Sequence, residues 1–397
     1  MIFFLLIFLA LVFGFSFLAI PEAHIAVINL DAKQSYFLSE AGAEDVVYRM
    51  TKGKNYSPTE VLTLNGSSVT TNVIDMGGGV KEITSQGDVS NAIRKVRINV
   101  KEGVGISFTY GVQVGDAGLI MGNGTSIVGN IFSNGNIQGG GISQSTVTGT
   151  AQVAGSNSMK DITVNQDAYA GSFQNCQIGN TAHYVTSFTN CTAGSTQILS
   201  PPLTPANFPI SQTQIDVWKA EAAAGAVLNG YTLGNNTSAS LGPKKISGDM
   251  TLGNNVILTL TGTVWVTGTV NLGNSDTIKL DAGYGTKSGI LIVDGSVNLG
   301  NTVILSGSGQ TGSYIMILSS FGPGTAIDIG NSATSAILYS PNGTIAIGNN
   351  LALRQATGYG LTIGNNSSIT YETGLANALF VSGPAGSVTI ESWKEIE

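Results

Sequence analysis

Acidic, basic and histidine side chains are the first place to look for chemistry. Enzymes that cleave polysaccharides on repetitive β folds need clustered carboxylates with basic partners, or a metal site. Here the only two histidines, His24 and His183, lie in different regions, and only Lys279 accompanies the nearest acidic pair, Asp276 and Asp281. The pattern predicts no catalytic residue, no metal site and no cofactor, so we do not expect an enzyme.

The two cysteines lie in two copies of the pattern Ser-Phe-x-Asn-Cys, at Cys176 and Cys191. This spacing predicts that the two copies stack, which brings the cysteines within reach of a disulfide. Two interpretations stay open: a disulfide, or two free thiols that only pack. Neither indicates catalysis or metal binding, because no histidine or third cysteine accompanies the pair.

A repeat must position these residues. From about residue 104 the chain repeats [Leu/Ile]-Gly-Asn-[Asn/Ser/Thr], with short apolar runs between the copies. Such spacing indicates stacked units, and short strands ended by Gly, Asn or Ser indicate a parallel β-solenoid. Gly and Asn tolerate the left-handed backbone of a sharp corner. Repeated asparagines are expected to ladder their side-chain amides along the stack. The predicted corner residues are Asn235, Asn254, Asn274, Asn301, Asn331, Asn349 and Asn365.

Residues 200–226 interrupt the repeats. The proline-rich SPPLTPANFP is extended, and ISQTQIDVWKAEAAAGA predicts a helix with Ser211 as N-cap and Gly225 at its end. The predicted domains are a first solenoid lobe at 104–205, a linker and capping helix at 206–226, and a second lobe at 227–397. The charged end of the chain, VTIESWKEIE, is expected to cap the last coil.

The N-terminal segment is quite different. Residues 1–21 hold no charged side chain, and as a helix they would span about 30 Å, one hydrocarbon thickness. Residues 22–50 predict an amphipathic helix that ends at Gly53. A cleavable signal fits poorly, because no basic residue precedes the apolar run, whereas a plain membrane anchor is an alternative. Residues 54–103 predict a small antiparallel sheet with a hairpin at Asn65-Gly66.

Gly14 and Pro21 both interrupt the apolar run and weaken a helix. With these two positions, residues 1–53 resemble the N-terminal helix of mature type IV pilins, in particular the PilX-like and general-secretion K-type minor pilins. The resemblance implies a helix that packs in a filament core and melts between Gly14 and Pro21. It also implies a prepilin peptidase that leaves a methylated Met1, and a pilus assembly machinery. Most pilins carry glutamate at the fifth mature position, where this chain has Leu5.

The predicted fold class is α+β, mostly β: a long N-terminal helix melted between Gly14 and Pro21, a small antiparallel sheet, and a parallel β-solenoid in two lobes. The predicted function is a structural subunit of a type IV pilus-like extracellular filament. The chain would form a helical homo-oligomer through residues 1–53, lie in the inner membrane before assembly, and be displayed at the cell surface afterwards.

Two alternatives to this function stay open. One is a minor or tip pilin, or an adhesin, that binds a surface glycan through exposed aromatic side chains. The other is a membrane-anchored surface protein that never polymerises. The net charge of −7 indicates no nucleic-acid groove. The candidate aromatic residues are Trp265, Tyr284, Tyr314, Tyr339 and Tyr359.

Overall fold

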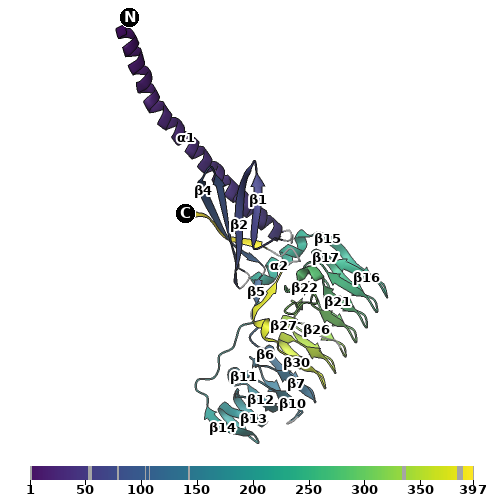
Figure 1. Cartoon of the computed structure of the whole chain (residues 1–397). Coiled ribbons are helices and arrows are strands. Elements are labelled where there is room, and N and C mark those ends of the chain that lie inside the picture. The colour runs from purple at the N-terminus through teal and green to yellow at the C-terminus, as the bar shows by residue number, and fades with distance from the viewer. Residues whose placement is uncertain are drawn as a thin grey trace. The chain divides into compact units, whose positions relative to one another are not determined.

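The chain forms two compact units (Figure 1). Unit 1 comprises residues 1–103 and 385–397, and unit 2 comprises residues 104–384. The computed structural model describes residues 2–51, 56–77, 80–102, 104–106, 108–141, 144–332, 337–381 and 388–396.

Unit 1 begins with one unbroken helix, α1 (Ile2–Thr51). The predicted melting between Gly14 and Pro21 is wrong, because the helix continues through both residues. A proline in a helix removes one intrahelical hydrogen bond and strains the preceding turn. The backbone on either side of Pro21 stays helical, so the other peptide groups there keep their intrahelical hydrogen bonds.

The helix packs on an antiparallel sheet in the order β1-β2-β3-β4-β32. The predicted hairpin at Asn65-Gly66 is confirmed, with φ of 50° and 84° at the two turn residues. The predicted role of the C-terminal segment is wrong: β32 does not cap a coil but pairs with β4, where Trp393 lies opposite Ile98. The strands are β1 (Thr59–Leu64), β2 (Ser67–Gly77), β3 (Val80–Val89), β4 (Ala92–Glu102) and β32 (Val388–Ile396).

Two glycines let α1 approach this sheet closely. A Cβ on Gly87 would lie 2.3 Å from the Ser35 carbonyl oxygen, and a Cβ on Gly42 would lie 2.6 Å from Ser85 Oγ. The Ser35 hydroxyl donates to the Gly87 carbonyl at 2.6 Å. The core below this contact comprises Ala43, Val46, Met50, Ile83, Val96, Ile98 and Val100. Among the described residues of α1, those that pack on the sheet therefore lie in its second half.

Unit 2 is built from short strands that stack in parallel, coil upon coil, and we call this body the parallel stack (Figure 1). Its lower-numbered segment contains β6 (Val112–Met121), β7 (Thr125–Val128), β8 (Ile131–Ser133), β9 (Ile137–Gln138), β10 (Ser145–Val147), β11 (Ala151–Val153), β12 (Ser158–Val164), β13 (Ala168–Thr189) and β14 (Thr192–Ile198). A separate antiparallel pair joins β5 (Val104–Ile106) to β31 (Ala378–Phe380).

The higher-numbered segment has longer coils. Its strands are β15 (Val227–Leu233), β16 (Ser238–Leu241), β17 (Lys244–Leu252), β18 (Ile257–Leu260), β19 (Val264–Val266), β20 (Val270–Leu272), β21 (Thr277–Leu280), β22 (Gly289–Val293), β23 (Val297–Leu299), β24 (Ile304–Ser306), β25 (Ile315–Ser319), β26 (Thr325–Ile329), β27 (Ile337–Ile347), β28 (Ala352–Leu353), β29 (Gln355–Ile363) and β30 (Ser368–Thr370). The short 3-10 helices are η1 (Ala282–Tyr284) and η2 (Thr373–Asn377).

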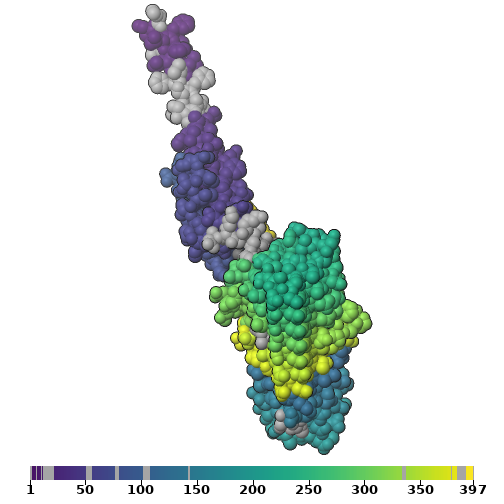
Figure 2. Space-filling view, turned by 90° about the vertical axis from the view of Figure 1, so that its right-hand side faces the viewer, coloured from purple at the N-terminus to yellow at the C-terminus, as the bar shows by residue number. Residues whose placement is uncertain are grey.

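The predicted fold class, with its melted helix and two solenoid lobes, is wrong. The two segments form one continuous sheet instead of two lobes, because β29 pairs in parallel with β6 and β30 with β7. Ala356 lies opposite Val112, and Ile363 lies opposite Met121. Figure 2 shows this joint, which we call the seam, where the yellow coils meet the blue ones. Joining the segments buries both edges, which separate lobes would leave open.

The helix α2 (Gln212–Ala224) lies along the flank of the stack. The predicted caps are confirmed: Ser211 Oγ accepts from the Gln214 N–H, and Gly225 ends the helix. Ile215 and Trp218 are buried against outward-facing residues of the longer coils, among them Ile292 and Leu318. Consequently the strands β22 and β25 are buried on both faces.

Candidate functional site

The described residues in the first thirty positions of α1 form an exposed apolar surface. Phe4 is 80% exposed and Phe8 69% exposed. Contiguous apolar surface of this kind marks a site of association with protein or membrane. We call it the α1 apolar surface; its described members are Ile2, Phe3, Phe4, Leu5, Ile7, Phe8, Leu9, Leu11, Ile25, Val27, Ile28 and Leu30.

The same helix changes from exposed to partly buried near Ser35. From there Leu38, Ala43 and Val46 are buried on the sheet, and the Asp45–Arg49 ion pair at 2.8 Å follows one turn of the helix. The anchored half fixes the direction in which the uncovered half leaves the sheet. The arrangement can therefore present an apolar rod to a partner in a direction that the sheet of unit 1 defines.

The structure tests the predicted assembly residues only in part. Leu5 is described and is 65% exposed. Met1 lies outside the described residues, and only the helical backbone of Gly14 and Pro21 is described. Assembly through these residues stays a prediction. Over the helix residues that the structure describes, we find no stretch both long and apolar enough to cross a membrane.

The corner asparagines of the stack form a ladder, which we call the asparagine ladder. The Oδ1 of each one accepts from the backbone N–H of the next, as in Asn235 to Asn254 at 2.8 Å and Asn254 to Asn274 at 2.8 Å. The expected amide-to-amide bonds are secondary, at 3.3 Å between Asn301 and Asn274. The ladder continues through Asn301, Asn331, Asn349 and Asn365.

The left-handed backbone falls one position later than the sequence indicated. It occurs in the residue after each ladder asparagine, for example Asn236 at φ 57° and Asn255 at φ 59°. The preceding glycine is needed for closeness instead. A Cβ on Gly273 would lie 2.4 Å from the carbonyl oxygen of Gly253 in the neighbouring coil. In each repeat, the glycine therefore permits close stacking, and the residue two positions later adopts the left-handed turn conformation.

Sequence reasoning missed one ladder member, Asn123. Its N–H donates to Asn365 Oδ1 at 2.8 Å across the seam. A partial signal was present, because Met121-Gly122-Asn123-Gly124 matches the repeat at its central Gly-Asn, with Met in place of Leu and Gly in the fourth position.

The two cysteines lie in adjacent coils and are both free thiols in the structure. The Cys176 N–H donates to Cys191 Sγ at 3.0 Å. Burial raises the pKa of the Cys176 thiol to about 12, so the reactive thiolate is suppressed. The disulfide stays a prediction.

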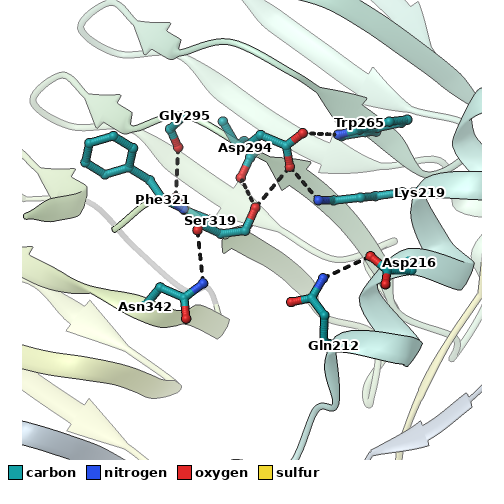
Figure 3. A network of polar contacts seen from close by, with 11 residues as sticks. Gln212, Asp216, Lys219, Trp265, Asp294, Gly295, Ser319, Phe321 and Asn342 are labelled. Carbon is teal, nitrogen blue, oxygen red and sulfur yellow. Dashed lines mark hydrogen bonds and ion pairs between the residues drawn. The ribbon is translucent and has the colours of Figure 1, made fainter. Parts of the chain in front are cut away.

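Asp294 and Asp281 hold local structure in the stack. Asp294 accepts from Trp265 Nε1 at 2.9 Å and pairs with Lys219 of α2 at 2.6 Å, which fastens the helix to the flank (Figure 3). Asp281 Oδ1 accepts from the Gly283 N–H in the turn that contains η1. Across the described ranges, no three side chains of His, Cys, Asp or Glu gather as metal ligands.

Asp276 is the one fully buried carboxylate among the described residues of the stack. Its Oδ1 accepts from the Val256 N–H at 2.8 Å, while Oδ2 lacks a partner. Burial raises the pKa of this carboxyl group above its usual range, and the hydrogen bonds from the backbone partly oppose that shift.

The five aromatic residues predicted to mark a glycan-binding face do not share one exposed surface. Tyr284 and Tyr339 are buried, and the Tyr339 hydroxyl donates to the Ile210 carbonyl at 2.9 Å. Trp265 and Tyr314 are half-buried in polar contacts with Asp294 and Glu372. Tyr359 is 41% exposed. These five residues do not form one exposed platform.

Comparison with protein families and with curated proteins finds no match. Among solved structures, the chain is distantly similar to the crystal structure of the competence-associated pilin ComZ from Thermus thermophilus. The identity is 10%, the TM-score is 0.31, and the alignment covers 92% of this chain and 97% of ComZ. A similarity of this degree carries no functional argument. The function is therefore inferred from the surfaces of the chain itself.

Proposed function

We propose that the chain is a structural subunit of a type IV pilus-like extracellular filament, which polymerises through the α1 apolar surface and displays the parallel stack outside. The observation that carries the proposal is the exposed apolar stretch of a helix whose other half is anchored on a sheet. Before assembly this stretch would lie in the inner membrane; after assembly it would lie in the filament core.

Helix packing determines whether the apolar stretch is more stable in the inner membrane or in the filament core. Lipid tails are as apolar as leucine, so transfer from bilayer to bundle gains little from the hydrophobic effect, and van der Waals contacts between helices dominate. Leu5 needs no partner in such a bundle, whereas an unpaired carboxylate there would be costly. Processing by a prepilin peptidase and assembly by a pilus machinery belong to this proposal.

Photo-crosslinking in cells that carry the native protein tests it. The residue p-benzoylphenylalanine replaces Phe8 on the α1 apolar surface, and, as the control, replaces Tyr359 on the stack. Filament assembly predicts crosslinks from position 8 to the first thirty residues of a second copy. Adducts with lipid alone at position 8 would contradict the proposal. Crosslinked protein that is found only at filament ends would identify a tip subunit and contradict the role as a structural subunit along the filament.

A further inference from the structure

The apolar core of the parallel stack comes to the surface at both ends. Almost all of its members are covered by the coils above and below. The partly buried members that pack against it lie in the two terminal coils, four at each end. One end, the β14 end, holds Tyr184, Phe188, Cys191 and Ala193; the other, the β15 end, holds Leu228, Tyr231, Leu233 and Ala239.

Each end also carries open strand edges. Within the described residues, β14 pairs only with β13, β15 only with β17, and β16 only with β18. Proteins usually protect such edges with charged side chains. Neither residues 168–199 nor residues 227–243 contain any Asp, Glu, Lys or Arg. Both ends are therefore neutral, partly apolar and open to pairing.

The seam shows how this chain joins stack edges that are not consecutive. There β29 and β6 pair in parallel over Ala356–Ile363 and Val112–Met121, and the asparagine ladder continues from Asn365 to Asn123. The β15 end presents the start of the same ladder, since Asn235 Oδ1 accepts from the Asn254 N–H, and no described side-chain oxygen precedes Asn235 in the ladder.

We propose that the β14 end of one copy pairs with the β15 end of a second copy, head to tail, as a joint of the same kind as the seam. Parallel pairing favours unlike ends, because joining two like ends by a two-fold axis would set the strands antiparallel. A head-to-tail contact is heterologous and propagates into rows. The joint uses no residue of α1 and goes beyond the proposed function.

The test uses the full chain in detergent, which covers the α1 apolar surface so that remaining association reports the stack. Leu233→Lys places a charge at the β15 end, and Ala193→Lys places one at the β14 end. Ala352→Lys is the matched control, because Ala352 is exposed on a middle coil. Sedimentation velocity over a concentration series measures association, and circular dichroism with thermal melting verifies folding.

The proposal predicts concentration-dependent rows for the wild type and for Ala352→Lys. Each end variant alone should be monomeric, and an equimolar mixture of the two should form dimers and nothing larger, through their intact ends. A monomeric wild type, or self-association of either end variant, would overturn it. If an end variant melts early, the exposed edge residues Thr232 and Thr196 take the same substitution by lysine. Failure of filament assembly through α1 leaves this result unaffected.

Discussion

Asn365 and Asn123 are joined by a hydrogen bond of 2.8 Å although 242 residues separate them. The order of the coils along the stack therefore differs from their order in the sequence. The stack runs from β15 to β30 and then continues with β6. Pairing over such separations carries a large loop-closure cost before native contacts form, which is typical of slowly folding topologies.

The seam should contribute measurably to stability. Asn365→Ala removes the oxygen that accepts from Asn123, and we expect a loss of about 0.5–1.5 kcal/mol in the free energy of unfolding. Denaturant titration measures it. The control is Asn298→Ala, which removes one exposed side-chain bond to Asn271 and should cost less. Equal losses in both variants would contradict a special role of the seam.

Close stacking at the corner glycines can be tested by adding one methyl group. Gly273→Ala would bring a Cβ to 2.4 Å from the Gly253 carbonyl oxygen, and we expect a destabilisation of about 1–3 kcal/mol. Gly234→Ala is the matched control, because nothing lies within 4 Å of its added Cβ. Thermal unfolding distinguishes the two. If both variants melt together, close stacking at Gly273 does not contribute measurably to stability.

Local signals in the sequence predicted local structure. Asn65-Gly66 defines a hairpin and Ser211 begins α2, because each acts on its own neighbours. The repeat also placed most ladder asparagines correctly. It could not reveal the seam or the pairing of β32 with β4, since nothing local specifies which distant edge a strand joins. The predicted melting near Pro21 was wrong because a proline weakens a helix without always ending it.

The thiols should differ in reactivity. In reduced, folded protein, we expect slow alkylation of Cys176, because burial raises its pKa to about 12, and faster alkylation of the half-buried Cys191. Mass spectrometry over time measures both, and unfolded protein, where the rates should converge, is the control. Cys176 reacting first in the folded state would contradict the buried position.

The buried carboxylate Asp276 should make stability depend on pH. Its folded pKa is raised above the unfolded value, so the folded state binds more protons between the two, and the free energy of unfolding falls as pH rises through that window. At neutral pH the charged group is unfavourable, and Oδ2 lacks a hydrogen-bond donor.

Asp276→Asn keeps an oxygen for the Val256 N–H and removes the charge. We expect it to raise the free energy of unfolding at neutral pH, because it removes the buried negative charge that burial disfavours. Below the unfolded pKa of aspartate, about 3.9, the advantage should vanish because the wild-type group is then protonated in both states. Asp249→Asn, on an exposed corner where Oδ1 accepts from the Thr269 N–H, is the control and should show no such gain. An advantage of Asp276→Asn that is equal at acidic and neutral pH would assign the effect to packing, because only ionisation of the buried carboxylate links the gain to pH.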